Sequence, residues 1–274
     1  MDTFLNIALG VFVFIYALAW LLVFLGRLGG SVGKWLAGKC VAAPGLDIVV
    51  SLLTWVPWGF GVYLAGWGGV LASVIGQIVG LTLWIWTHEW VNRRHTQGSR
   101  IVKSLNGIVG RTRNHLALWA STIVLPVFWL IRLGEILVYP MIRVLLGFPK
   151  YKDNQWINVS RQKFAGLVGH DLVWCLYCDW MTGVYSFGAE MLRNVESFWC
   201  PIRFSDQNKC QNCQLDFPDI KKGWVKADGT LKEVTDTLEE KYSGTNRSWF
   251  GHPSRSSPPP QGDTDPKGVT PADH

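Results

Sequence analysis

The stretch from Thr3 to Leu25 contains no charged residue and is apolar almost throughout. At about 1.5 Å per residue, a helix of this length crosses the roughly 30 Å of hydrocarbon in a bilayer. A cleaved signal peptide is the alternative. However, no basic residue precedes the stretch, which is too long for the apolar core of such a peptide, and no small-residue cleavage site follows. We therefore expect a membrane-spanning helix that is not removed.

A second apolar run extends from Ile48 to Trp86 and is too long for a single crossing. Near its middle, the sequence Gly66-Trp67-Gly68-Gly69 is a natural chain break. The run therefore predicts two antiparallel helices, at about 48–65 and 68–87. Asp47 precedes the first of them and is a candidate for its N-cap.

The stretch 88–115 is the most basic part of the chain, with six Lys or Arg residues against Glu89 alone. Its apolar residues recur with helical spacing at Ile101, Leu105, Ile108 and Val109. This pattern predicts a basic amphipathic helix that lies in the membrane interface. An ordinary solvated loop with a short helix is the alternative, because internal glycines interrupt the stretch.

A fourth apolar segment covers 116–148 and is interrupted by Arg132 and Glu135. It fits one tilted span followed by a surface helix, or a re-entrant hairpin that returns to the same side. The two charged residues, spaced i and i+3, predict an intramembrane ion pair or a helix end with snorkelling side chains.

Positive charge is concentrated in the apolar part of the chain. Residues 1–149 hold 11 Lys or Arg and 4 Asp or Glu, a net charge of +7, whereas residues 150–274 hold 15 and 16, a net charge of −1. This distribution favours anionic lipid head groups as partners and argues against nucleic acid. The loops 26–45 and 88–115 carry +3 and +5, which places both on the cytoplasmic side and the N-terminus outside.

From Pro149 the composition becomes that of a globular domain. The chain as a whole is expected to be mainly α: a membrane domain over 1–148, a small Cys-rich soluble domain over 149–242 and a disordered tail over 243–274. Within the soluble domain we expect a helix over 160–199, bent near Gly183 and Gly188. A loop-rich knuckle with short strands should follow over 200–232, and then a short helix over 235–242.

Two Cys-x-x-Cys pairs lie in the soluble domain, and they are separated by 31 residues. Two such pairs can supply a tetrahedral zinc site, although their separation exceeds that of compact zinc motifs. An iron–sulfur cluster, redox thiols or plain packing of buried cysteines are the alternatives. Five cysteines are an odd number, which suits reduced thiols and a cytoplasmic location. The predicted metal ligands are Cys175, Cys178, Cys210 and Cys213.

Other polar residues near these cysteines are candidates for catalysis. Asp179 or Glu190 could serve as a general acid or base, and Cys200 as a reactive thiol. Glu190 can instead pair with Arg193 at i+3, in a purely structural ion pair.

The sequence therefore predicts an integral, multi-pass membrane protein with a zinc-binding soluble domain on the cytoplasmic side. Its expected role is that of an assembly, scaffold or regulatory module that binds a partner protein. A membrane-bound redox or thiol-dependent enzyme that uses the cysteines and neighbouring carboxylates is the alternative. A transporter is disfavoured, because the apolar segments contain few polar residues.

Overall fold

The structure is a computed structural model that describes residues 2–216 and 220–242, with the side chains of all of these except 2, 212–216, 221 and 222. Across these ranges the chain is mainly helical, as expected, and it forms no strand. Its backbone contacts divide it into a first unit, Met1–Ile131 with Lys152–Phe187, and a second unit, Arg132–Tyr151 with Gly188–His274. The expected domain boundary at 148 stays a prediction, and the predicted tail 243–274 lies outside the described residues.

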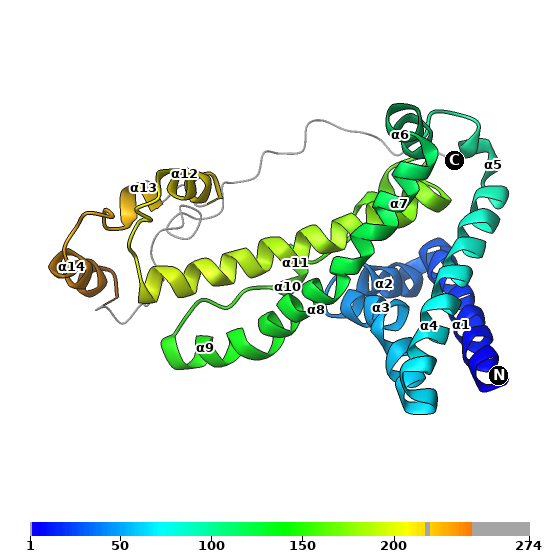
Figure 1. The fold of residues 1–274 in the computed structure, drawn as a ribbon, viewed down its shortest axis with the longest axis horizontal. Helices are drawn as coiled ribbons and strands as arrows, with labels where there is room; N and C mark the ends of the chain where they lie inside the picture. Colours follow the sequence, from blue (N-terminus) through cyan, green and yellow to red (C-terminus); the bar gives the residue numbers. More distant parts are fainter. Residues whose placement is uncertain (1, 217–219, 243–274) are drawn as a thin grey trace. The chain divides into compact units, whose positions relative to one another are not determined.

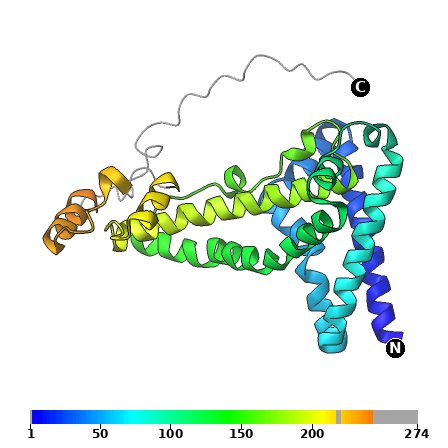
Figure 2. The same cartoon turned by 45° about the horizontal axis from the view of Figure 1, so that its top comes forward.

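The first unit is built on α1 (Asp2–Arg27) and α4 (Trp55–Val91). Helix α4 is interrupted at Ala65 and Gly66, where the backbone is not helical and Gly66 has φ = 58°. Here the chain reverses direction (Figure 2). Two hydrogen bonds join the segments on either side of the reversal: Gln77 Nε2 donates to the carbonyl of Leu53 at 3.0 Å, and Ser73 Oγ donates to that of Pro57 at 2.9 Å. The predicted antiparallel hairpin and its glycine break are therefore confirmed, although the predicted first helix over 48–65 is divided at Thr54, where one helix ends and α4 begins.

Small residues allow the helices of this unit to approach closely. A Cβ atom added to Gly69 would collide with the backbone of Gly61 on the other arm of the hairpin. Farther along the second arm, Gly76 and Gly80 meet the backbone of α1 at Ala8 and Phe12. Helix α1 therefore lies against the second arm of α4 (Figure 1), in the small-residue packing common between membrane helices.

Shorter elements complete the first unit. They are α2 (Gly30–Cys40), α3 (Gly45–Leu53), α5 (Arg93–Thr96), α6 (Ile101–Val109), α7 (Arg111–Ser121), α10 (Asp153–Trp156) and the 3-10 turn η3 (Arg161–Lys163). The expectation that Asp47 caps a helix is wrong, because α3 begins at Gly45 and Asp47 lies within its first turn.

The described chain stays helical from residue 111 to residue 146. Helix α7 continues through η1 (Thr122–Val124), α8 (Leu125–Leu133), the π-helical turn η2 (Gly134–Val138) and α9 (Tyr139–Leu146). Three helices, Thr3–Arg27, Trp55–Val91 and Arg111–Leu146, are long and apolar enough to cross a membrane.

Helix α11 (Gly169–Trp199) begins in the first unit and ends in the second. It starts later than the predicted helix over 160–199, and it is not broken at Gly183 or Gly188. Gly183 has a packing role, since a Cβ there would collide with the backbone carbonyl of Trp156.

The second unit buries a group of polar side chains between α9 and the end of α11. Arg132 Nη1 pairs with Glu135 Oε2 at 2.9 Å, and both side chains are almost fully buried. This confirms the predicted ion pair. Asn194 Nδ2 donates to the hydroxyl oxygens of Tyr139 at 2.9 Å and Tyr151 at 2.8 Å, so the buried amide is satisfied.

The second unit continues with α12 (Gln207–Asp216), α13 (Ile220–Gly223) and α14 (Leu231–Tyr242). The loop-rich knuckle with short strands expected over 200–232 is thus wrong in its details. Within the described part of that range, two short helices and a single parallel bridge between Ile202 and Val225 are present. The short helix expected over 235–242 is confirmed and begins four residues earlier.

Candidate membrane-interface site

The end of the second arm of α4 is fixed to the start of α11 by a buried histidine. The Nδ1 atom of His88 accepts a hydrogen bond from the backbone N–H of Gly169 at 3.0 Å. Its ring stacks on that of Trp84, with centroids 4.7 Å apart. His88 therefore acts as a packing residue between two helices.

Arg100 is the centre of a charged cluster at the same place. Its guanidinium pairs with Glu89 at 2.7 Å and with Asp171 at 3.1 Å, and only 7% of the side chain is exposed. The hydrogen bond to Glu89, followed by that to Asp171, raises the pKa of Arg100 against the opposing effect of burial. The charge of Arg100 is thus permanent.

The same two carboxylates also hold backbone groups. Asp171 Oδ1 accepts from the N–H of Val102 at 2.9 Å, and Glu89 Oε1 accepts from the N–H of His170 at 3.0 Å. The cluster therefore joins the end of α4, the start of α6 and the start of α11. It sets the direction in which α6 leaves the spans.

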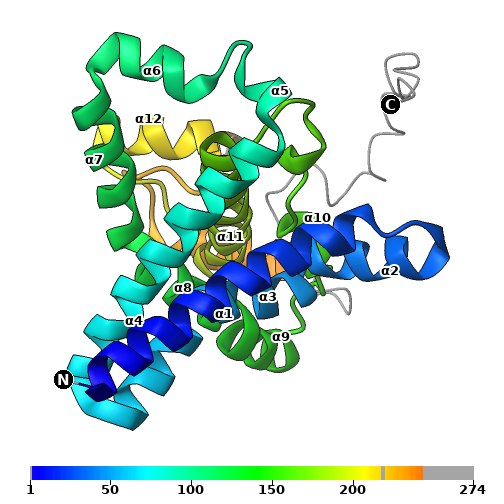
Figure 3. The ribbon, with the colours of Figure 1, turned by 90° about the vertical axis from the view of Figure 1, so that its right-hand side faces the viewer.

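Helix α6 carries the predicted apolar stripe, although it covers only Ile101–Val109 of the stretch 88–115, and the stripe is open. Ile101 is 50% exposed, Leu105 37%, Ile108 76% and Val109 46%, and no residue of the helix is buried. Gly110, with φ = 88°, ends the helix, and α6 and α7 then run in different directions (Figure 3). The exposed cations Arg93, Arg94 and Lys103 are on or next to this element.

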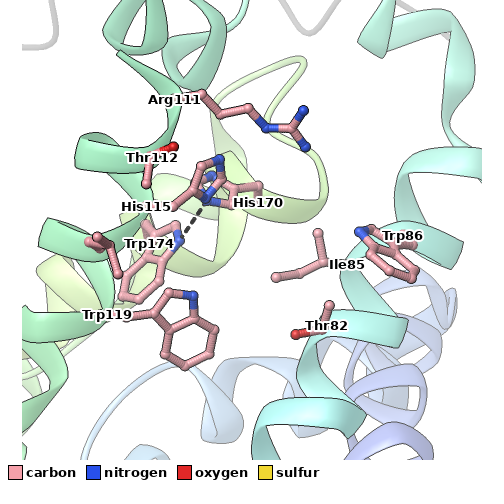
Figure 4. Close-up of a pocket in the computed structure, with 10 residues that line it drawn as sticks. Thr82, Ile85, Trp86, Arg111, Thr112, His115, Trp119, His170 and Trp174 are labelled. Atoms are coloured by element: carbon pink, nitrogen blue, oxygen red, sulfur yellow. Dashed lines mark hydrogen bonds between the residues drawn. The ribbon is translucent and has the colours of Figure 1, made fainter. Parts of the chain in front are cut away.

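A pocket of about 420 Å³ lies beside this region (Figure 4). It is formed by the last turns of α4, the first turns of α7 and the first turns of α11. Its lining residues are Thr82, Ile85, Trp86, Arg111, Thr112, His115, Leu116, Trp119, His170 and Trp174.

Cationic and hydrogen-bonding groups share this pocket with indole walls. The rings of His115 and His170 meet edge to face, with centroids 4.8 Å apart. Trp174 Nε1 donates to His170 Nε2 at 3.1 Å, which assigns the proton of neutral His170 to Nδ1. Burial, followed by the nearby His115, lowers the pKa of His170, although Asp171 and Glu89 act in the opposite direction. The pocket can thus offer N–H donors and the charge of Arg111 to an anion.

The two predicted cysteine pairs lie in different units. Cys175 and Cys178 are one turn apart on α11 in the first unit, and burial raises the pKa of the Cys175 thiol. Cys210 and Cys213 are one turn apart on α12 in the second unit, not in the loop-rich knuckle expected there. The side chain of Cys213 lies outside the described ones. Among those that are described, no three His, Cys, Asp or Glu side chains gather to hold a metal ion. The zinc site stays a prediction.

The three catalytic candidates occupy separate places. Asp179 Oδ2 accepts from the backbone N–H groups of Ser160 at 2.7 Å and Arg161 at 3.1 Å, and thereby holds η3. Glu190 is buried in the second unit, where Tyr151 donates to it at 3.0 Å and Arg193 pairs with it at 3.9 Å. Cys200 is exposed immediately after α11. Asp179 and Glu190 thus have structural partners, and their catalytic roles stay predictions.

Sequence reasoning missed the cluster around Arg100 and the pocket. A partial signal was present, because Arg111 and His115 are spaced i and i+4 and must share a helix face. Among the tryptophans at the end of α4, Trp84 is 5% exposed, whereas Trp86 and Trp90 are 66% and 73% exposed. No protein-family model, curated protein or solved structure matches the chain.

Proposed function

We propose that this chain is an integral, multi-pass membrane protein that works as an adaptor at the lipid–water interface. The open apolar stripe of α6, next to exposed cations, carries this proposal. Each stripe side chain that enters lipid contributes on the order of 1 kcal/mol or more. Each nearby Lys or Arg adds about 1 kcal/mol over an anionic leaflet. The partners are therefore a bilayer and its anionic head groups, with no role for nucleic acid.

The adaptor presents its soluble part on the cytoplasmic side. Support comes from the first unit, where Ala43 donates its backbone N–H to Ile157 at 3.0 Å and Val159 donates to Val41 at 2.8 Å. At the other end of that stretch, Gly169 is bonded to His88. Residues 157–169 are thus tied to the two basic loops, which the positive-charge rule assigns to the cytoplasm.

The segment 111–146 enters the bilayer in this proposal but does not emerge on the far side. Residues 147–152, which connect it to α10, are not helical. From the far side of the membrane they would have to recross the roughly 30 Å of hydrocarbon before the chain reaches Ile157. A non-helical chain in lipid would leave its backbone groups without partners.

The environment of α6 can be tested with a fluorescent label in vesicles. Ile108→Cys lies on the stripe, and Gly107→Cys lies away from it, where an added Cβ meets no atom within 4 Å. The unsubstituted chain is the blank that corrects for labelling of the native cysteines. A quencher in the lipid should quench the label at position 108, whereas aqueous iodide should quench the label at position 107. Anionic lipid should strengthen the difference. Equal iodide quenching at both positions would contradict the proposal.

The cysteines provide a second candidate feature, a zinc site that orders the cytoplasmic part for a protein partner. Two i, i+3 thiol pairs on helices, each able to grip one edge of a tetrahedron, support it. Chain purified without chelator should then carry about one zinc per molecule. Cys210→Ser should lose the metal, whereas Cys200→Ser should keep it. Visible absorption would favour the iron–sulfur or redox-enzyme alternative.

A further inference from the structure

The pocket between α4, α7 and α11 differs from the rest of the apolar surface in its chemistry. It combines Arg111, Thr112 and two imidazoles with the indoles of Trp86 and Trp119. Its volume of about 420 Å³ lies in the range of small-molecule sites, which are mostly apolar with a few polar groups that orient the ligand.

The position of the pocket restricts what can enter it. Thr82 and Trp86 belong to the last turns of one candidate span, and Arg111 and Trp119 to the first turns of another. Ends of membrane helices lie at the depth of the head groups. Trp86 and Leu116 line the pocket and are themselves 66% and 65% exposed, so apolar surface continues outward from it along both spans.

We propose that this pocket binds the phosphate group of a single-chain or double-chain phospholipid. Arg111 supplies the charge, and Thr112 and His115 supply hydrogen-bond donors (Figure 4). The acyl chain follows the exposed apolar surface of Trp86 and Leu116. A water-soluble phosphate ester has the same anionic chemistry and is distinguished from a lipid by the experiment.

The support around the pocket is already rigid. His170 is oriented by Trp174 and by its backbone bond to Glu89, and the Arg100 cluster fixes the start of α11. His170 therefore acts as a positioning residue, whose ring packs against His115. A preorganised pocket binds its ligand at a lower entropic cost.

Calorimetric titration of the full chain in an uncharged sugar detergent tests the proposal. The ligands are lysophosphatidic acid, the monoacylglycerol with the same chain, and glycerol 3-phosphate. Lysophosphatidic acid should bind saturably and at least about tenfold more tightly than the monoacylglycerol, which lacks only the phosphate. Glycerol 3-phosphate that binds as tightly as the lipid would assign the phosphate site to a soluble ester. Weaker binding assigns it to a lipid.

Two arginines on one helix provide the matched variants. Arg111→Gln should weaken lysophosphatidic acid binding about tenfold, whereas Arg113→Gln, which is exposed and does not line the pocket, should leave it unchanged. Both should keep the parent melting temperature. Equal effects of the two substitutions, or equal binding of the monoacylglycerol, would overturn the proposal. Ile108→Asp on α6 should not alter this binding, so failure here is distinguishable from failure of the interfacial anchor.

Discussion

Arg100 stabilises three chain segments through two carboxylates that it shields from solvent. Replacing it by Met would leave Asp171, whose side chain is 4% exposed, as an unpaired buried charge. Losing one partner of such a pair costs about 3 kcal/mol. Thermal unfolding in detergent should show this loss for Arg100→Met and almost none for Arg94→Met, which changes an exposed arginine. Equal melting temperatures of the two variants would show that the cluster around Arg100 does not stabilise the fold.

His170 makes the fold sensitive to acid. Its pKa in the folded chain lies below the ordinary value of 6.5, so the unfolded chain takes up a proton more readily. The stability that neutral His170 contributes is complete above about pH 6.5 and is lost as the pH falls toward the lowered value. The melting temperature should therefore decrease more between pH 7.5 and pH 5.5 for the parent than for His170→Gln. His95→Gln, at an exposed position, should behave like the parent.

At this scale the sequence was informative where partners are close along the chain. The ion pair of Arg132 with Glu135 and that of Glu190 with Arg193 followed from helical spacing. The bond of Arg100 to Asp171 joins residues 71 positions apart, and no periodicity brings such residues together. The same reason hid the pocket, whose lining comes from three separate helices.

Among the elements, the α4 hairpin depends on two glycines that face each other. Gly69→Ala would place a methyl group against the backbone of Gly61, which cannot move without separating the arms. Overpacking of this kind costs about 1–3 kcal/mol. Gly68→Ala is the control, because an added Cβ there meets no atom within 4 Å. Resistance to unfolding by an ionic detergent should drop for Gly69→Ala alone. Equal resistance of the two variants would mean that the arms are not in contact.

Apolar length was sufficient to predict α1, and a glycine break was sufficient to predict the hairpin. The helical spacing of apolar residues predicted the apolar stripe of α6. Prediction failed for elements whose limits depend on packing. Gly183 suggested a bend in α11, but it is a contact point where the backbone of Trp156 approaches the helix. The polar sequence around Cys210 suggested a turn, but it forms α12.

For the whole molecule, the main question is on which side of the membrane the soluble part lies. We propose the cytoplasmic side. Composition alone left this open, because the segment 116–148 allowed both a span and a return to the same side. The backbone bond of Ala43 to Ile157 and the bond from the Gly169 N–H to the His88 ring favour one side for both basic loops and the stretch between 157 and 169. The proposed zinc site would need reduced cysteines, and therefore the cytoplasmic side.

Labelling with a membrane-impermeant maleimide in sealed vesicles of known orientation tests this most directly. Ala165→Cys and Gly98→Cys report the two stretches proposed to share a side, and Trp67→Cys reports the turn of the hairpin, where the indole is 85% exposed. The unsubstituted chain is the blank for the native cysteines. We expect positions 165 and 98 to react only from the cytoplasmic side and position 67 to react only from the opposite side. Reaction of position 165 from the same side as position 67 would contradict it.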